Sequence, residues 1–513
     1  MLGYSQIQQS ESTLERTADD DFGDDIQLQE REQGQSHHAC ADDNYDEDTD
    51  DDVETEKHIP ETVPKWKLYQ TYGSVIKSSC IAALPRFCQP QGLKVRGRLH
   101  PTSYLDALRG YAAFIVYIYH TVSWNAFNTS WRHQPFISIL FGGEGMVAVF
   151  YVISGFVLSY SLLRNIRRQE SAPTLQGLAS STFRRYLRLY GSTVLAIFIT
   201  LILVRLGWYN GNENNLYKPS LIDQIKDWLL DVIFYCNPFA DIRGWWYGEV
   251  HNTRYLSTMW TIPVEFRGSI VVFCFCAAIC KLSTRSRMIL TWMIIFLGYV
   301  WNALYVSQFL YGVFVADLSL GRDPERLMRP GDLPNTRELH TKCQSKKQTI
   351  WAKIGYSLLF ILGIFILGQP NETELGVWGQ FPWGFLKPLI PWYYDSASGL
   401  YWYLSMGAFV LVLSLESYPT LHRPLEWGIS QYIGDLSFGI YAMHPTLLYG
   451  FYQTWEEPMR QKHFGDSPWG YLPGLIVMTF LLLASADYFT RMDKKVVQFG
   501  KWLQGKTFRE WEN

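Results

Sequence analysis

The sequence predicts an all-α protein: a polytopic membrane helical bundle of about ten transmembrane helices, preceded by a disordered acidic N-terminal tail. Two observations predict this class. The 513 residues are 16% aromatic and only 18% charged, which is unusual for a soluble protein. The charge is also uneven, because residues 1–60 hold 19 acidic and 3 basic side chains, a net charge of −16, whereas the rest of the chain carries +13. A polar tail therefore precedes a body built of long apolar segments.

Residues 1–64 are expected to form a disordered cytosolic tail. They include the acidic run from Asp42 to Asp52 and have too little apolar surface to offset the entropy cost of ordering. No cleavable signal peptide is visible in this region. The juxtamembrane segment 65–99 mixes basic with apolar residues. It fits either a helix lying on an anionic cytosolic leaflet or an ordinary basic flank of the first span.

Ten segments of the body approach the roughly 20 apolar residues that a membrane span needs. Residues 287–319 form one apolar stretch of 33 residues, too long for one helix without steep tilt, so we split it near Asn302. Residues 221–236 have amphipathic spacing and predict an interfacial helix. The ten predicted spans are 105–123, 140–163, 187–206, 259–280, 287–303, 304–319, 351–368, 398–416, 429–450 and 470–490.

The distribution of basic residues predicts that both termini face the cytosol. With that orientation the inner loops and the basic C-terminal tail at 491–513 hold 21 Lys and Arg, against 8 in the outer loops, in line with the excess of positive charge on the cytosolic side. The arginine-containing segment 164–186 is then a cytosolic loop. Two glycosylation sequons, at Asn128 and Asn371, fall in outer loops.

The eight cysteines indicate thiols rather than a disulfide framework. Only Cys236 falls in a predicted outer loop. Cys274, Cys276 and Cys280 lie within one apolar segment, where packing of small side chains is the favoured interpretation over metal ligation. We therefore expect no metal site.

The first predicted span places three ionisable side chains on one helix face. At 100° per residue, Arg109 and His120 are separated by about 20° around the helix and about 16 Å along it, and Asp106 lies one turn before Arg109. Each such group is costly in hydrocarbon, so this face must line the bundle interior or water. A plain alternative is an ion pair between Asp106 and Arg109 at the cytosolic edge, with His120 capping the outer edge.

Two further spans carry ionisable groups at a similar predicted depth. Glu265 follows Trp260 and Pro263 near the outer end of the fourth span, and His444 lies in the outer half of the ninth. With His120, these groups converge on one layer. A histidine is a suitable general base near neutral pH, and a nearby carboxylate can orient it.

The second and third spans add small and basic residues. Ser154 lies beside Gly155 in the second span and suits close helix packing. Arg184, Arg185 and Arg188 cluster at the start of the third span. They fit either the positive-inside pattern or a set of fork-shaped donors for phosphate groups.

Taken in order, these motifs are similar to those of the acyltransferase-3 family of multi-spanning membrane O-acyltransferases. The resemblance covers about residues 100–490, which we take as one membrane domain. It rests on LDALRG at 105–110 with ten residues between Arg109 and His120, FYVISGF at 150–156, RRYLR at 184–188, WTIPVE at 260–265 and SFGIYAMH at 437–444.

The resemblance implies transfer of an acyl group from acyl-CoA to a hydroxyl of a small molecule, lipid or carbohydrate. It implies His120 as general base and a requirement for Arg109. No cofactor other than acyl-CoA as co-substrate is expected, and the partners are membrane lipid and the acceptor, not nucleic acid. Members often carry an aspartate where this chain has Ala148, which leaves Glu265 as the stronger carboxylate candidate. Supporting roles are expected for Asp106, Ser154, Trp260, Ser437, Tyr441 and His444.

The resulting hypothesis places CoA phosphates at Arg184, Arg185 and Arg188, runs the thioester past Arg109, and lets His120 deprotonate the acceptor. Two other classes of function use similar features. Buried Arg, Glu and His also mark proton or substrate pathways in transporters and flippases, although no internal hydropathy repeat is visible here. A non-catalytic lipid sensor or scaffold is the other alternative.

Overall fold

The computed structural model describes residues 81–94, 99–122, 134–209, 216–238, 252–327, 349–369, 382–394, 396–465 and 468–508. The expectations for the tail at 1–64 and for the sequons at Asn128 and Asn371 lie outside these residues. The chain divides into two units, Met1–His100 and Pro101–Asn513. Within the first, a short 3-10 helix, η2 (Arg86–Cys88), is described.

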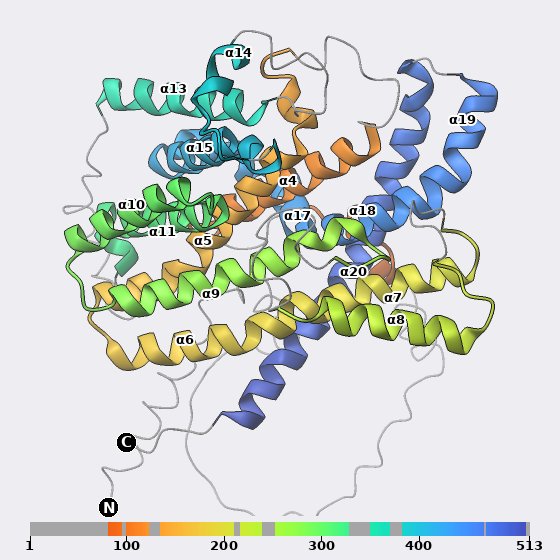
Figure 1. The fold of residues 1–513 in the computed structure, drawn as a ribbon, viewed down its shortest axis with the longest axis horizontal. Coiled ribbons are helices and arrows are strands. Elements are labelled where there is room, and N and C mark those ends of the chain that lie inside the picture. The colour runs from red at the N-terminus through yellow and green to blue at the C-terminus, as the bar shows by residue number, and fades with distance from the viewer. Residues whose placement is uncertain are drawn as a thin grey trace, which may run out of the picture. The chain divides into compact units, whose positions relative to one another are not determined.

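The described part of the second unit contains helices and no strand, so the all-α class is confirmed. Figure 1 shows these helices with their labels. The longer helices are α4 (Ser103–Val122), α5 (Gly143–Arg167), α6 (Ser171–Tyr186), α7 (Ser192–Arg205), α8 (Leu221–Tyr235), α9 (Thr261–Ile279), α10 (Thr284–Val300), α11 (Leu304–Arg322), α13 (Ile350–Leu367), α15 (Ser396–Ser417), α17 (Gly428–Asp435), α18 (Ser437–Leu447), α19 (Glu457–His463) and α20 (Tyr471–Thr507).

Short elements link these helices. Two are π-helical, η4 (Leu187–Gly191) and η10 (Leu448–Glu456). The others are α14 (Trp383–Leu386), α16 (Pro419–His422), η3 (Ser138–Phe141), η5 (Ser257–Trp260), η6 (Pro324–Leu327), η8 (Lys387–Leu389), η9 (Arg423–Glu426) and η11 (Pro468–Gly470).

Seven helices in the described residues are long and apolar enough to span a membrane, against ten spans predicted. They are Gly143–Arg167, Ser171–Arg205, Ser257–Ile279, Leu304–Arg322, Ile350–Leu367, Ser398–Ser417 and Tyr471–Thr507. The other three predicted spans are also helical, but each has a reason to fall short. Helix α4 carries ionisable side chains, α10 has only 17 residues, and the segment 429–450 is divided among α17, α18 and η10.

The predicted break near Asn302 is confirmed. Helix α10 ends at Val300 and α11 begins at Leu304. Asn302 between them has φ of 54°, a left-handed conformation that asparagine tolerates better than most residues and that stops a right-handed helix.

Two segments predicted to be loop or tail are helical instead. Residues 171–186, placed in a cytosolic loop, form α6 and continue through η4 into α7 as one helix, Ser171–Arg205. Residues 491–507, placed in a C-terminal tail, extend α20 to Thr507. The two extensions contact each other, since Ser180 donates a hydrogen bond to Gln504 (3.2 Å) and the rings of Phe183 and Phe508 lie 5.3 Å apart. This packing stabilises helices that apolar content alone did not predict.

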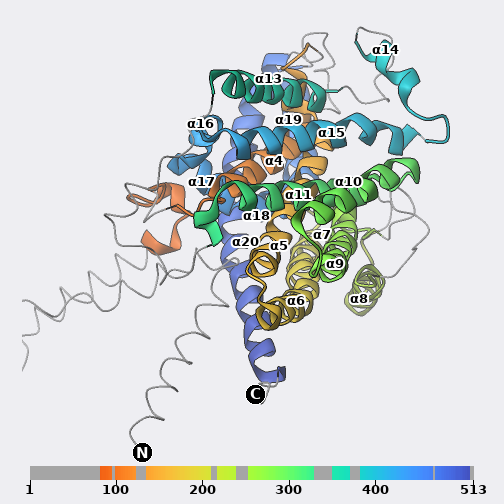
Figure 2. The same ribbon diagram turned by 90° about the vertical axis from the view of Figure 1, so that its left-hand side faces the viewer.

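The core forms around α5, which packs against α4, α9, α11 and α15. Close approach to α11 depends on two glycines. A Cβ on Gly155 would lie 1.9 Å from the Phe309 carbonyl oxygen, and one on Gly312 would lie 2.1 Å from that of Val152. Figures 1 and 2 show α13 beside α15 toward one edge of the bundle and α6 beside α9 toward the opposite edge.

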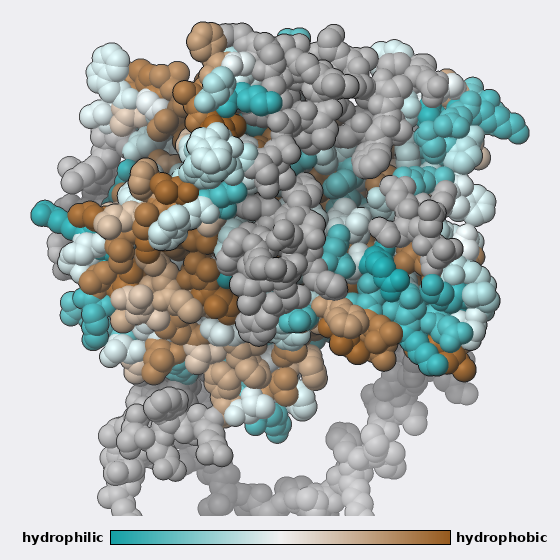
Figure 3. All heavy atoms as spheres, in the orientation of Figure 1, coloured by the Kyte–Doolittle hydropathy of each residue, from teal (hydrophilic) through white to brown (hydrophobic). Residues whose placement is uncertain are grey.

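The outer face is apolar, as expected for helices that face lipid. Figure 3 shows apolar side chains gathered on the side that carries α9 to α11, where Ile289 and Phe296 of α10 are 63% and 67% exposed. The predicted amphipathic helix at 221–236 is present as α8. Its polar side chains Asp227 and Asp231 bind Arg254, and its apolar side chains point outward.

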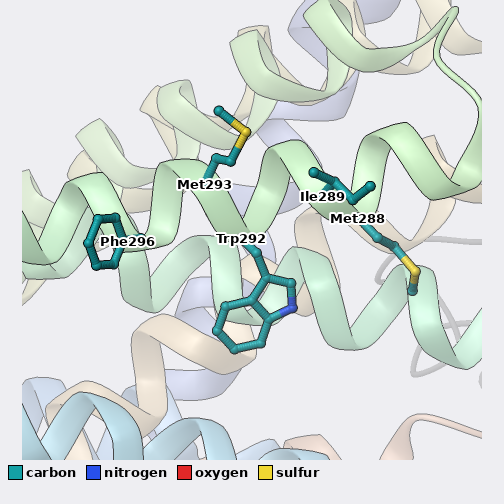
Figure 4. A pocket seen from close by; sticks show the side chains of 5 residues that line it. All are labelled: Met288, Ile289, Trp292, Met293 and Phe296. Atoms are coloured by element: carbon teal, nitrogen blue, oxygen red, sulfur yellow. The ribbon is translucent and has the colours of Figure 1, made fainter.

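A surface hollow on α10 is lined only by apolar side chains of that one helix. Figure 4 shows the five, Met288, Ile289, Trp292, Met293 and Phe296. The hollow offers no group that could hold a charged or reacting atom. It is a lipid-facing feature, so the chemistry has to be sought at the polar face of α4.

Candidate active site

Helix α18 faces the polar side of α4 along its length. Ser437, Tyr441 and His444 are four and three residues apart and therefore share one helix face. The Nε hydrogen of Arg109 is donated to the Ser437 hydroxyl (3.0 Å), and the rings of His120 and His444 lie together. The structure thus brings both ends of the α4 polar face against one face of α18.

The approach of α4 to the neighbouring α17 depends on glycine. A Cβ added to Gly110 would lie 2.5 Å from the Ile433 carbonyl carbon, and one added to Gly434 would lie 2.8 Å from the Ala107 amide nitrogen. Since α17 leads directly into α18, this contact brings the start of α18 beside Arg109 of α4. It explains why Ser437 is within reach of that guanidinium.

His120 and His444 form a nearly parallel ring pair. Their ring centroids are 5.3 Å apart with an interplanar angle of 21°, and Tyr119 meets the His120 ring edge-on at 5.1 Å. His120 is half-buried, whereas His444 is 1% exposed. Among the described residues His120 makes no hydrogen bond.

Tyr441 ties α18 to the start of α9. It donates a hydrogen bond to the Thr258 carbonyl oxygen (2.5 Å) and lies 2.5 Å from the Thr261 hydroxyl. Trp260 occupies the junction between η5 and α9 next to these threonines. These contacts hold the N-terminus of α9 beside Tyr441, which lies one helical turn before His444.

Glu265 lies one turn into α9 and is not hydrogen-bonded to either histidine. Its carboxylate accepts a hydrogen bond from Ser154 (2.6 Å) and forms an ion pair with Arg185. Arg185 also donates to the Ser269 hydroxyl (2.7 Å). The expected partnership between this carboxylate and His120 is therefore absent, because α9 carries Glu265 away from Thr261 toward Arg185.

The arginines of α4 and of the α6–η4 junction form one basic cluster. Arg188 lies within electrostatic range of Arg109, Arg184 and Arg185, with Asp493 of α20 as the nearby anion. Arg188 is exposed and makes no hydrogen bond or ion pair with any described residue. Because Glu265 neutralises only Arg185, the cluster retains net positive charge and suits an anionic ligand.

The sequence alternative of an Asp106–Arg109 ion pair is not observed, since Arg109 bonds to Ser437 instead. Asp106 is exposed at the same end of α4. Ser154, expected to serve in packing, also binds Glu265. Sequence reasoning missed Asp493, which accepts a hydrogen bond from Ser192. Its position just after an apolar segment was taken as tail.

In the part of the chain that the structure describes, no three His, Cys, Asp or Glu side chains gather closely enough to hold a metal ion. The groups that line the polar face of α4 are the histidine pair, the basic cluster and the hydroxyls between them.

Comparison with known proteins gives the family of the chain. A family model described as an acyltransferase domain, that of the acyltransferase-3 family, matches residues 102–490. The chain belongs to the acyltransferase-3 family. Its apolar helices make it an integral membrane acyltransferase. No solved structure matches the chain.

Three curated relatives carry acyltransferase names. The O-acetyltransferase PaAT-1 of Phomopsis amygdali is 28% identical over 83% of this chain and 88% of its own length. The acyltransferase clz18 of Cochliobolus lunatus is 22% identical over 68% and 83%. The acyltransferase R4 of a Phoma species is 21% identical over 62% and 70%. The similarity thus extends over most of the length of each relative.

Proposed function

We propose that this acyltransferase-3 protein is an O-acyltransferase that moves an acyl group from acyl-CoA to a hydroxyl of a small molecule, lipid or carbohydrate. One observation carries the proposal. The polar face of α4 has an open guanidinium cluster at one end and a partly exposed histidine at the other. The name of the relative PaAT-1, an O-acetyltransferase, supports oxygen as the acceptor atom and acetyl-CoA as the first donor to test.

The basic cluster suits the phosphates of CoA. Arg188 is the best-placed donor because it is exposed and lacks a partner among the described side chains, and Arg184 and Arg109 add charge nearby. Arg185 contributes less, since Glu265 holds it. CoA carries its phosphates and its thioester at opposite ends of an extended arm. A donor of this shape requires a phosphate site at some distance from the base. Arg109, in the basic cluster, and His120 meet this requirement, since they lie about 16 Å apart along α4.

His120 is the proposed general base. It removes the proton of the acceptor hydroxyl as the oxygen attacks the thioester carbonyl, an oxygen–carbon bond forms, and the carbon–sulfur bond breaks. The thiolate of CoA then takes the proton back from His120. Glu265 acts in this scheme by neutralising Arg185 and ordering the basic cluster, not by contacting the histidine.

The test measures acyl transfer by the full-length protein and by His120→Ala, both in lipid nanodiscs. Radiolabelled acetyl-CoA is the donor, and a metabolite extract of cells that express the protein supplies the acceptor. We expect CoA release that depends on the extract, and a labelled ester that mild alkali cleaves. Removal of a general base lowers a rate by about 10²–10⁴-fold, so His120→Ala should lose nearly all turnover while accumulating normally in membranes.

His463→Ala is the matched control, because His463 is exposed on α19 and should leave turnover unchanged. Retained turnover in His120→Ala would refute the assignment of the base. A transporter or flippase predicts no acceptor-dependent CoA release from the wild-type protein. That result would refute the proposed function.

A further inference from the structure

His444 presents a buried hydrogen-bond acceptor that nothing in the described structure uses. Its ring is 1% exposed, and Nδ1 lies 3.3 Å from the Ile440 carbonyl oxygen. A carbonyl oxygen can only accept, so Nδ1 carries the hydrogen, and in the neutral ring Nε2 then holds the lone pair. Nε2 is buried and has no hydrogen-bond partner. Leaving a buried acceptor unpaired costs free energy and calls for a functional explanation.

His120, by contrast, requires a hydrogen-bond acceptor when it acts as a base. A histidine that takes a proton from a substrate becomes a cation with two N–H donors, one of which requires an acceptor other than the substrate. Catalytic histidines commonly use a carboxylate for this purpose. Here the carboxylate expected from the sequence, Glu265, is occupied by Arg185 and Ser154, and Glu144 accepts a hydrogen bond from Tyr119. No described carboxylate is hydrogen-bonded to His120. The adjacent ring is His444.

We propose that His444 is the positioning residue of His120, an inference that rests on the proposed function. In the reactive complex one N–H of His120 is donated to Nε2 of His444, and the other nitrogen of His120 acts as the base. The 5.3 Å between the ring centroids is short enough for ring rotation to bring two nitrogens within about 2.7–3.2 Å. Catalytic hydrogen bonds often tighten only when substrate is bound.

The arrangement is set by backbone geometry. Ile440 lies one helical turn before His444, so its carbonyl oxygen fixes the tautomer. Tyr441, anchored to Thr258 and Thr261, lies 5.7 Å from the His444 ring and limits its movement. His444 thus remains fixed while the half-buried His120 is free to turn.

Two substitutions separate the acceptor from the ring. His444→Phe keeps a planar ring against His120 but removes the acceptor, whereas His444→Gln places an amide oxygen near the position of Nε2. Both would be assayed as full-length protein in nanodiscs with acetyl-CoA and the cell extract, over a range of pH. We expect His444→Phe to lower kcat by about 10–100-fold, less than loss of the base itself, with KM for acetyl-CoA within about twofold of wild type.

The pH profile gives the readout that a merely structural role would not move. In the reactive complex His444 accepting an N–H favours protonated His120, so its loss should shift the acidic midpoint of kcat, which reports groups in the substrate-bound enzyme, to lower pH. His444→Gln should recover part of kcat and of the midpoint. His422→Phe is the control, since His422 stacks on Tyr104 away from this site and should match wild type.

Three outcomes would overturn the inference. They are wild-type kcat and midpoint in His444→Phe, a lowered kcat with an unmoved midpoint, or equal loss in the Phe and Gln variants. Activity that requires His120 but not His444 would refute this inference alone. A wild-type protein without acceptor-dependent CoA release would refute the proposed function, and this inference with it.

Discussion

At the scale of single residues, two arginines of one sequence motif have different roles in the structure. Arg185 is held by Glu265 and Ser269 in a largely buried ion pair. Arg188, three residues later, is exposed and bonded to no described side chain. Removing one partner of a buried pair is strongly destabilising because it leaves an uncompensated charge. A free guanidinium in a cluster of like charges instead gains from binding an anion.

The two arginines should therefore respond differently to substitution. Arg188→Ala should raise KM for acetyl-CoA by about tenfold or more, because hydrogen bonds to charged groups contribute about 1.5–3 kcal/mol, with little change in thermal stability. Arg185→Ala should destabilise the protein by about 3–5 kcal/mol. Steady-state kinetics and thermal unfolding in detergent measure the two effects.

Arg285→Ala is the control for both measurements, since Arg285 is exposed in the first turn of α10. An unchanged KM in Arg188→Ala would remove Arg188 from the donor site. Normal stability in Arg185→Ala would show that the Glu265 ion pair is not structural.

At the scale of elements, the site depends on how closely α4 and α17 approach. The glycine contact between Gly110 and Gly434 sets the register in which Ser437 meets Arg109 and His444 meets His120. A second pair, Gly155 and Gly312, packs α5 against α11 and so supports the helix that carries Ser154. Glycines in these helices therefore set the helix spacing on which the positions of the polar side chains depend.

Gly434→Ala tests this dependence. Its Cβ would lie 2.8 Å from backbone atoms of Asp106 and Ala107, so the helices must separate. Overpacking of this kind typically costs about 1–3 kcal/mol. We expect a lower unfolding temperature, and a fall in kcat because α4 carries both Arg109 and His120.

Gly355→Ala in α13 is the matched control, because a Cβ there would meet nothing within 4 Å. Equal stability and turnover in the two alanine variants would show that the α4–α17 contact does not control the site.

At the scale of the whole molecule, the number of membrane crossings follows from more than helix length. Seven helices meet the length and composition of a span. Of the three others, α10 is shorter than a span, whereas α4 and the segment 429–450 contain polar groups or breaks that the bundle interior accommodates. Polar spanning helices are tolerated where their ionisable side chains face protein or water. Helix α4, which carries Arg109 and His120, is for that reason not identified as a span by its apolar content alone.

The location of the two termini distinguishes ten membrane crossings from seven. Ten spans place both ends on one side of the membrane, and seven place them on opposite sides. With 21 basic residues in the predicted inner loops and 8 in the outer ones, we expect both termini in the cytosol. Epitope tags at each end of the full-length protein, probed with protease before and after membrane permeabilisation, measure this directly.

Protection of only one tag in sealed vesicles would contradict the ten-span topology. A tag inserted after Asn371, in a predicted outer loop, provides the internal control because it should show the opposite accessibility to the termini.

The sequence by itself determined the helical class, the break at Asn302 and the common face of Arg109 and His120, because helix periodicity and apolar length are local properties. It also contained the ordered motifs of the acyltransferase-3 family. Only the tertiary structure decided which groups are partners. Glu265 and Arg185 are 80 residues apart and Arg109 and Ser437 are 328 apart, and no local pattern links such distances. In the structure Glu265 pairs with Arg185 and not with His120, and the ring beside His120 is that of His444. Those pairings depend on how α4, α9 and α18 pack.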